Sequence, residues 1–332
     1  METSFNALLV SEKDGRFVKE VQKVQLYQLP DNELFIKVSH SCINYKDALS
    51  ASGNKGVTRK FPHVPGVDAA GIVIRSTSSL FAVGDEVLIT GFDLGMNTWG
   101  GFGEYISVPA SWVLRLPQGL TAQQAMAFGT AGLTAGLSVY ELVSKGITPN
   151  KGEVVVSGAT GGVGSMATAI LSKLGYNVAV VSGKREGEYL HNVLGAKRII
   201  GRDEFAEQYN SKAMASPAFA GGVDTVAGPI LSGMLKATQY GGTVTCCGMV
   251  SSANVDTSIF PFILRGVSLA GIDSVLAPMN LRRHVWQLLA TDWKPENLNS
   301  MVENISLNQL AAKLDEVLNG QAKGRYVLVH NE

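Results

Sequence analysis

An apolar run, a cluster of glycines and a helical stretch follow one another in the middle of the chain. Residues 154–157 (VVVS) have the composition of a buried strand, residues 158–164 (GATGGVG) contain four glycines, and residues 165–174 have helical spacing. Glycine permits positive φ and a close approach of the backbone to a pyrophosphate, and the first turn of a helix offers free N–H groups to an anion. The segment therefore predicts a dinucleotide-binding turn, with tight packing alone as the alternative.

The residues after the next expected strand indicate which dinucleotide binds. Sites for NAD place an acidic side chain about 20 residues after the glycines, where it binds the ribose hydroxyls. At that distance the chain has residues 182–185 (SGKR), and no Asp or Glu ends the strand. Because Lys and Arg form charge-assisted hydrogen bonds with a phosphate, this loop favours NADPH over NADH. A solvated basic loop, partly neutralised by Glu186 and Glu188, is the alternative.

Strand and helix patterns alternate through the second half of the chain. An Ala- and Leu-rich helical stretch covers residues 122–142, and short apolar strands separated by helical stretches follow it. Such alternation predicts a parallel sheet covered by helices on both faces. The expected strands are 153–157, 177–182, 197–200, 223–226, 243–247 and 267–271.

The first 125 residues have a different pattern. Short β segments separated by Gly and Pro predict an irregular, mostly antiparallel β domain. Examples are 5–10, 34–39, 71–75, 85–89 and 104–108. After Pro278 a helical stretch leads to a final strand at 325–330. A chain of 332 residues is long enough for about two domains. We expect residues 1–125 and 276–332 to form one domain and residues 126–275 to form the other.

Charge, cysteine content and hydropathy exclude several classes of protein. Lys plus Arg (28) equals Asp plus Glu (28), which argues against a dedicated binder of nucleic acid or anionic membrane. The three cysteines have the spacing of neither a disulfide framework nor a zinc motif, and Cys246 and Cys247 are expected in the core. The sequence contains no signal region, and no apolar run approaches the roughly 20 residues of a membrane span. We therefore expect a cytoplasmic protein.

Further motifs carry a resemblance to a known family. In chain order they are SCINYKDAL (41–49), PHVPGVDAAG (62–71), VGDEVL (83–88), GGFGEYISVP (100–109) and FGTAGLTA (128–135). Together they resemble the medium-chain dehydrogenase/reductase superfamily, most of all the NADPH-dependent acrylyl-CoA reductases and quinone reductases in its zinc-free quinone-oxidoreductase branch. The resemblance implies an α/β fold with a GroES-like, mostly antiparallel β catalytic domain. It also implies a Rossmann domain, a doubly wound parallel sheet, that binds NADPH.

The resemblance also bears on metal binding. Zinc-dependent members carry ligands in three of these motifs, and the matching positions here hold Asn44, Val67 and Thr130. Valine cannot bind a metal, and a catalytic zinc site needs about three protein ligands. We therefore expect no metal. Because no Lewis acid then polarises an alcohol, reduction of an activated double bond or of a quinone is the easier reaction.

The resemblance assigns roles to individual residues. Asn44, Tyr45 and Asp47 are the candidate catalytic residues, with the Tyr45 phenol as hydrogen-bond donor or proton relay near the nicotinamide. Packing is the alternative for Tyr45, and an ion pair with Lys46 that fixes the loop is the alternative for Asp47. The residues implied in cofactor binding are Tyr45, Thr160, Gly161, Gly162, Val163, Ser182, Gly183, Lys184, Arg202, Gly248, Met249, Asp273, Ser274 and Arg325. For Arg202 and Arg325 the alternative is an ordinary surface position.

The resemblance implies the NADPH-dependent reduction of acrylyl-CoA to propionyl-CoA. Quinone reduction is the alternative, and a non-catalytic NADPH- or RNA-binding protein is a third hypothesis. Lys55, Arg59 and Lys60 cluster in a loop that is either a solvated surface or a contact for the phosphates of CoA. Members of the superfamily commonly dimerise through the last strand of the nucleotide domain, near residues 267–271 here, which implies a homodimer.

Overall fold

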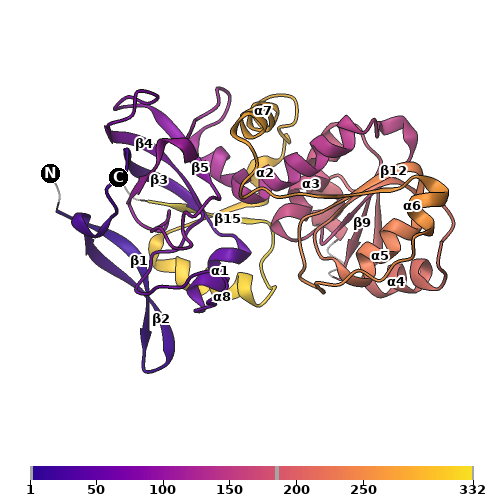
Figure 1. Ribbon diagram of the computed structural model, residues 1–332, viewed down its shortest axis with the longest axis horizontal. Helices are drawn as coiled ribbons and strands as arrows, with labels where there is room; N and C mark the ends of the chain where they lie inside the picture. The colour runs from indigo at the N-terminus through magenta and orange to yellow at the C-terminus, as the bar shows by residue number, and fades with distance from the viewer. Residues whose placement is uncertain (1–2, 184–186, 331–332) are drawn as a thin grey trace. The chain divides into compact units, whose positions relative to one another are not determined.

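The chain folds into two compact units, which the computed structural model describes for residues 3–183 and 187–330 (Figure 1). The first unit consists of Met1–Thr130 and Met301–Glu332, and the second unit consists of Ala131–Ser300. The boundary near residue 130 lies close to the one expected after residue 125. The return of the chain to the first unit lies 25 residues later than expected, at 300 instead of 275.

The first unit is built around an antiparallel sheet. Its strands are β1 (Ser4–Lys13), β2 (Arg16–Gln25), β3 (Leu34–Cys42), β4 (Asp68–Ser76), β5 (Glu86–Thr90), β6 (Tyr105–Val108), β7 (Leu114–Arg115), β14 (Val302–Ile305) and β15 (Arg325–Val329). The sheet has the order β14-β15-β3-β4-β5-β7, with β6 also paired to β3 and β1 paired to β2 in a separate hairpin. Among the described strands of this unit, β14 and β15 pair in parallel and the other pairs are antiparallel. The prediction of a mostly antiparallel β domain is confirmed.

The strand β2 is not among the strands expected from the sequence. It is mostly polar, and it pairs with β1 along its whole length. Asp14 and Gly15 join the two strands with positive φ of 51° and 73°. Two left-handed residues form the turn that matches the twist of a hairpin, and Asp-Gly is a typical sequence for it. The turn residues, more than any apolar alternation, therefore specify this hairpin.

Two short helices pack against the sheet of the first unit. Helix α1 (Tyr45–Ala51) follows β3, and helix α8 (Leu310–Leu318) lies beside it (Figure 1). Leu310 and Leu314 of α8 are buried in one cluster with Leu8 of β1 and with Phe102. Burial of these side chains fixes the position of α1, whose first turn carries the candidate catalytic residues.

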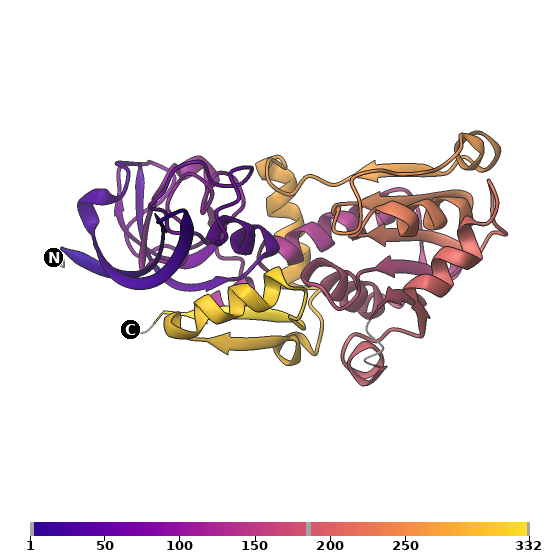
Figure 2. The same ribbon diagram turned by 90° about the horizontal axis from the view of Figure 1, so that it is seen from below.

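The second unit is a parallel sheet with helices on both faces (Figures 1 and 2). Its strands are β8 (Val154–Ser157), β9 (Val178–Ser182), β10 (Arg198–Gly201), β11 (Phe219–Asp224), β12 (Thr238–Cys246) and β13 (Ser268–Gly271). The order is β10-β9-β8-β11-β12-β13, and all pairings are parallel. Its helices are α2 (Ala122–Ser144, which begins in the first unit), α3 (Gly162–Lys173), α4 (Arg202–Asn210), α5 (Gly228–Ala237), α6 (Phe260–Arg265) and α7 (Met279–Ala290). The predicted doubly wound sheet is confirmed.

The strand β11 begins four residues before the strand expected at 223–226. It contains Gly221 and Gly222, which sequence reasoning treats as strand breakers. A Cβ at Gly221 would contact Leu142 of α2, while a Cβ at Gly222 would lie 2.5 Å from Cε of Met234 in α5. The two glycines thus point to opposite faces, and the missing side chain at Gly222 lets α5 approach the sheet closely.

The helix α7 explains the misplaced domain boundary. A Cβ added to Gly136 of α2 would lie 2.7 Å from Val285 of α7, so the two helices are in close contact. The Arg282 guanidinium of α7 donates hydrogen bonds to the carbonyl oxygens of Ser274 (2.6 Å) and Ala277 (3.0 Å). These buried contacts hold residues 276–300 in the second unit, although the sequence there lacks a strand–helix repeat.

The helix α2 is long and apolar enough to cross a membrane, with a mean hydropathy of 1.2. This corrects the expectation that no stretch of the chain passes such a test. Of its most apolar window, 78% is buried inside the protein, as in the core helix of a globular domain. The helix is rich in small apolar residues such as Ala and Gly, and these allow other elements to pack closely against it.

Cys246 and Cys247 are not core residues as expected, because each is only partly buried. The strand β12 ends at Cys246, so strand alternation does not extend to Cys247. The backbone N–H of Cys247 donates to the carbonyl oxygen of Asp224 at 3.1 Å. Burial raises the pKa of the Cys247 thiol to about 12. The thiol therefore stays protonated at neutral pH.

Replacing Gly129 by Ala should destabilise the protein strongly. Gly129 interrupts α2 with a φ of 53°, and a Cβ there would overlap Cys42 Sγ and lie 2.6 Å from Asp68 Oδ2. We expect the free energy of unfolding to fall by about 3 kcal/mol or more, from backbone strain and overpacking together. Gly15→Ala is the control: its φ is 73° but nothing lies within 4 Å, so about 1 kcal/mol is expected. Equal losses in urea unfolding would contradict the packing argument.

Candidate functional site

The first turn of α1 is fixed to the chain before β4 by Asp47. The backbone N–H of Asn44 donates to Asp47 Oδ2 at 2.7 Å. The other carboxylate oxygen, Oδ1, accepts hydrogen bonds from the N–H groups of Val67 (2.8 Å) and Gly66 (3.2 Å). Asp47 is fully buried, and burial together with the nearby charge of Asp68 raises its pKa to about 7. The carboxyl group therefore ties two segments together and has no exposed surface.

The side chain of Asn44 is held at both ends. Its Nδ2 donates to Asp68 Oδ2 at 2.7 Å, and its Oδ1 accepts from both terminal nitrogens of Arg325 at 3.3 Å. Arg325 begins β15, and Asp68 begins β4. An amide bonded to a carboxylate at one end and to a guanidinium at the other has only one satisfactory orientation. We call these bonds to Asp68 and Arg325 the Asn44 clamp. They fix the residue that immediately precedes Tyr45.

Asp68 is the centre of this network. It is fully buried and accepts hydrogen bonds from four donors: Thr130 N (2.8 Å), Thr130 Oγ1, Asn44 Nδ2 and Cys42 Sγ (3.0 Å). Burial and the neighbouring Asp68 raise the pKa of the Cys42 thiol. Cys42 is therefore a protonated donor here. Four donors and the nearby Arg325 compensate the buried charge, which would otherwise be very costly.

The three positions at which zinc-dependent relatives are expected to carry ligands all belong to this network. Asn44 and Thr130 bond to Asp68, and the N–H of Val67 bonds to Asp47. Within residues 3–183 and 187–330, no three His, Cys, Asp or Glu side chains are grouped as metal ligands would be. The polar groups at these positions instead bond to the carboxylates of Asp68 and Asp47. That the protein binds no metal remains a prediction.

Arg325 is neither the surface arginine of one hypothesis nor accessible enough to reach a ligand readily. It is 4% exposed, and besides Asn44 it donates to Cys42 Sγ (3.0 Å), the Ile43 carbonyl (3.1 Å) and the Ala127 carbonyl (3.3 Å). These contacts join β15 to the end of β3 and to α2. The structure thus gives Arg325 a positioning role, and cofactor contact by it stays a prediction.

Tyr45 is the accessible residue of this group. It is the first residue of α1 and is 47% exposed, and its hydroxyl has no hydrogen-bond partner among the described residues. Its two supports, Asn44 and Asp47, are fixed as described above. Asp47 bonds to backbone N–H groups and not to Lys46, so the ion pair considered from the sequence does not form. Tyr45 can therefore offer a phenol O–H to a bound ligand from a rigid position.

The glycine-rich turn of the second unit follows β8, which is buried throughout. Gly158 has a φ of 61°, and its carbonyl accepts the N–H of Gly161 at 2.9 Å. A Cβ at Gly164 would overlap that same carbonyl, so α3 begins directly against the turn. The tip of the turn, Thr160 and Gly161, is partly exposed, and no side chain caps the first turn of α3. Free N–H groups at Gly162 and Val163 can therefore bind a phosphate.

A buried carboxylate ties together the strand ends beside this turn. Asp224, at the end of β11, accepts from Ser157 Oγ (2.8 Å) and from Ala227 N (2.8 Å). Thr225 N donates to the same Ser157 Oγ at 2.8 Å. Burial raises the pKa of Asp224. The network fixes the carboxyl ends of β8 and β11, where the strand order reverses and where nucleotides bind in such sheets.

The residues expected at the adenosine phosphate lie close together. Ser182 ends β9 and pairs with Gly201, which precedes Arg202 at the start of α4. A Cβ at Gly183 would lie 3.1 Å from a guanidinium nitrogen of Arg202, so the exposed Arg202 side chain rests against Gly183. Parallel pairing brings these residues together although they are 19 positions apart in the sequence. Lys184 lies outside the described residues.

The remaining predicted residues differ in accessibility. A Cβ at Gly248 would overlap the Thr225 carbonyl, so only glycine fits there, and the following Met249 is 72% exposed. Asp273 is exposed and accepts the N–H of Val275 at 2.8 Å. Ser274 is buried, and its Oγ lies 2.6 Å from Thr134 Oγ1. Gly248, Met249 and Asp273 can therefore reach a ligand more readily than Ser274.

Sequence reasoning missed Asp68 and Asp224, the two buried carboxylates that organise these sites. Each lies in an apolar strand, next to Val67 and Val223 respectively. A single acid inside an apolar run is the available signal, because a buried charge needs partners. The partners themselves, Thr130 and Ser157, come from distant parts of the sequence and give no signal.

Two family models match the chain. Residues 30–118 match the model "Alcohol dehydrogenase GroES-like domain", and residues 162–291 match the model "Zinc-binding dehydrogenase". The first match falls in the first unit and the second in the second unit. Each family model therefore matches one of the two units, in the same order along the chain.

Two curated relatives match nearly the whole chain. Acrylyl-CoA reductase AcuI of Ruegeria pomeroyi is 42% identical over 98% of both chains. YhfP of Bacillus subtilis, whose name gives a provisional quinone oxidoreductase assignment, is 40% identical over 99% of both chains. The crystal structure of YhfP with NAD bound has a TM-score of 0.95 to this chain and is covered completely.

The YhdH protein of Escherichia coli K-12 was solved with NADPH bound. It is 42% identical, with a TM-score of 0.93 over 98% of this chain and 100% of that chain. Agreement of this extent in sequence and fold covers both units. The chain belongs to the medium-chain dehydrogenase/reductase family, in its quinone-oxidoreductase branch.

Proposed function

We propose that the protein is an NADPH-dependent reductase of an activated carbon–carbon double bond, and that it converts acrylyl-CoA to propionyl-CoA. The near-complete match to acrylyl-CoA reductase AcuI, over 98% of both chains, carries this proposal. The three positions at which zinc-dependent members carry ligands also support the proposal. Here they hold Asn44, Val67 and Thr130, which offer no set of metal ligands. A reaction in which the acceptor itself stabilises the added hydride fits such a site.

The residues of the second unit fit a dinucleotide with a phosphorylated ribose. The turn at Gly161 and Gly162 is accessible, and the uncapped start of α3 offers N–H groups to a pyrophosphate. Arg202 beside Gly183 supplies a positive charge for a 2′-phosphate. When bound, the nicotinamide supplies the hydride, which adds to the β carbon of the acrylyl group.

The first unit would stabilise the negative charge that develops on the substrate. Hydride addition to the β carbon leaves an enolate of the thioester, and a proton must then reach the α carbon. We propose that the Tyr45 phenol donates a hydrogen bond to this enolate and relays the proton, because its hydroxyl is accessible and free of protein partners among the described residues. The Asn44 clamp and Asp47 hold Tyr45 without reorganisation during the reaction.

Quinone reduction is the second candidate function. It is favoured by the name of YhfP, which is 40% identical over nearly the whole chain. A quinone also accepts a hydride without a metal, and its developing phenolate could use the same Tyr45 hydroxyl. The two candidate functions therefore use the same residues and differ in the substrate that is reduced.

We also propose that the protein is a homodimer. The strand β13 is an edge strand of the six-stranded sheet, and the helix α6 before it exposes Ile263 (64%) and Leu264 (60%). An unpaired edge beside exposed apolar side chains suits pairing with a second copy. A mass near twice 35.2 kDa in sedimentation equilibrium is the expected measurement. We further propose a cytoplasmic location, and the zero net charge argues against nucleic acid or an anionic membrane as a partner.

The proposed function is tested by comparing substrates with the purified protein. We expect NADPH oxidation with acrylyl-CoA and formation of propionyl-CoA, with kcat/KM at least about tenfold above that for small quinones, since such differences reflect transition-state binding. Dialysis against EDTA should leave the rate unchanged. Quinone turnover without acrylyl-CoA reduction would replace this function by the second candidate, and loss of activity with EDTA would contradict the metal-free site.

Tyr45→Phe should lower kcat for acrylyl-CoA by about 100-fold, the usual contribution of a positioned proton donor. The side chain is half exposed and the ring is kept, so the thermal unfolding temperature should not change. Tyr240→Phe, at a tyrosine that is 85% exposed in the second unit, is the matched control and should behave as wild type. An unchanged kcat in Tyr45→Phe would remove the phenol from the mechanism.

Arg202→Ala should weaken NADPH binding while leaving NADH binding nearly unchanged. Loss of a charged hydrogen bond to the 2′-phosphate costs about 1.5–3 kcal/mol, which corresponds to roughly 10- to 150-fold in Kd. Lys184→Ala is expected to act in the same direction. Lys197→Ala removes an exposed charge near β10 and serves as the control. Equal losses for both cofactors in a fluorescence titration would indicate that Arg202 supports the fold instead.

A further inference from the structure

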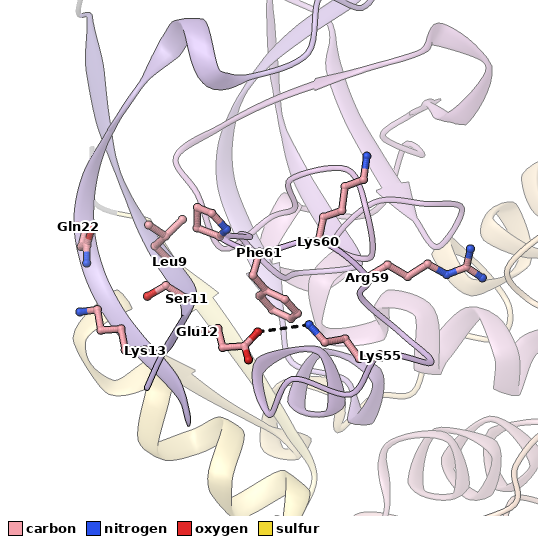
Figure 3. A pocket seen from close by; sticks show the side chains of 10 residues that line it. Leu9, Ser11, Glu12, Lys13, Gln22, Lys55, Arg59, Lys60 and Phe61 are labelled. Carbon is pink, nitrogen blue, oxygen red and sulfur yellow. Dashed lines mark ion pairs between the residues drawn. The ribbon is translucent and has the colours of Figure 1, made fainter. Parts of the chain in front are cut away.

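A pocket with a positively charged lining lies in the first unit, apart from the first turn of α1. It holds about 800 Å³ between the β1-β2 hairpin and the loop of residues 52–62 that follows α1 (Figure 3). Its charged and aromatic lining residues are Glu12, Lys13, Lys55, Arg59, Lys60 and Phe61. We call it the basic pocket. Its volume lies within the range of small-molecule sites.

Cations outnumber acids in the lining of the basic pocket. Lys13 is paired with Glu20 at 2.8 Å, and Lys55 lies 3.6 Å from Glu12. Arg59 and Lys60 form no ion pair with any described residue. Two uncompensated cations in a protein of zero net charge are a local feature and not a reflection of composition.

The loop that carries these cations is firmly built. The Asn54 carbonyl accepts the N–H groups of Val57 and Thr58, both at 3.0 Å. The hydroxyl of Thr58 is buried and lies 2.6 Å from Ser50 Oγ in α1. Gly53 has a φ of 83°, and a Cβ there would overlap the ring of Phe17 in β2. A loop fixed at several points holds its cations in place before a ligand arrives, which lowers the entropic cost of binding.

The aromatic rings near the loop orient Lys55. Its ammonium lies 4.7 Å from the ring centroid of Phe61 and 5.1 Å from that of Phe17. Figure 3 shows Lys55 extending toward Glu12, while Arg59 and Lys60 leave the same loop in other directions. The three cationic groups are therefore spread along the loop. This arrangement suits a ligand that carries phosphates at more than one place, and it suits a single small anion less well.

We propose that the basic pocket binds the phosphorylated adenosine end of a CoA thioester. This end carries a diphosphate and a separate ribose phosphate, which match cations spread along Lys55, Arg59 and Lys60. The helix α1 connects the pocket directly to Tyr45, and its seven residues span about 10 Å. The flexible pantetheine arm can cover that distance, which would place the thioester near the phenol. The proposal deepens the proposed function and rests on it for the identity of the substrate.

The proposal is tested by changing the charge of the loop and the length of the substrate separately. The double variant Arg59→Gln/Lys60→Gln leaves Lys55 and its contacts with the rings intact. We expect its KM for acrylyl-CoA to rise about tenfold or more with kcat unchanged, because the lost contacts act on a remote part of the substrate. Its KM for acrylyl-pantetheine, which lacks the nucleotide, should equal that of the wild type.

Matched controls separate a local site from general electrostatics. The variant Lys23→Gln/Arg283→Gln removes the same charge at exposed positions outside the pocket and should keep the wild-type KM for both substrates. A parallel rise in KM for acrylyl-CoA and acrylyl-pantetheine in the Arg59 and Lys60 variant would overturn the proposal. An equal rise for acrylyl-CoA in the control variant would also overturn it.

A binding measurement distinguishes the pocket from the reaction. With NADPH at saturation, adenosine 3′,5′-bisphosphate should bind the wild type in calorimetry, and the Arg59 and Lys60 variant should lose about tenfold or more in affinity, as expected for charged contacts. If this holds but acrylyl-CoA is not reduced, the pocket stands and the proposed function fails. If acrylyl-CoA is reduced but both variants match the wild type, the function stands and the pocket is overturned. Tighter binding of single-stranded RNA at the same residues would overturn it too.

Discussion

The buried charge of Asp68 is the constraint on which the first unit depends. Four hydrogen bonds reach its carboxylate from β3, from Asn44 and from α2, so the segments that supply them must converge at one point. Removing one of these donors would leave the buried carboxylate incompletely bonded, at a cost of about 1–3 kcal/mol. The same carboxylate requires glycine at position 129. The positive φ of Gly129 turns Thr130 toward Asp68, and the missing Cβ leaves room for the carboxylate. The accessible Tyr45 is then held by groups that cannot move independently.

The second unit places its functional residues by strand pairing. Parallel strands end at the same edge of the sheet, and the order β10-β9-β8-β11 brings the glycine turn, Ser182 and Arg202 to that edge. Asp224 has the same role here as Asp68 has in the first unit: its buried carboxylate bonds to Ser157 and joins two strand ends. Each unit therefore presents a few accessible groups on a rigid polar network, which suits a reaction in which the cofactor supplies the chemistry and the protein supplies orientation.

The sequence predicted what depends on local pattern and missed what depends on distant partners. Four of the six strands of the second unit lie close to their predicted positions because each is a short apolar run. The strand β11 begins four residues early, where Gly221 and Gly222 serve close packing, and β12 begins five residues early. The polar strand β2 had no apolar pattern, and its Asp-Gly turn was the signal that was missed. In the site, the motif around Asn44 was found, but its orientation by Arg325 could not be predicted because 281 residues separate the two.

The sequence by itself determined the two fold classes and the glycine turn, since strand length and glycine placement are local properties of the chain. Tyr45 was found through the family resemblance, and the structure showed that its side chain is accessible. The tertiary structure alone decided that Asp47 and Arg325 are buried supports, that Arg202 rests against Gly183, and that Lys55, Arg59 and Lys60 line a pocket with the β1-β2 hairpin. The physical reason is the same in each case. Burial, desolvation and charge compensation depend on which segments meet in space, and a linear pattern does not contain that information.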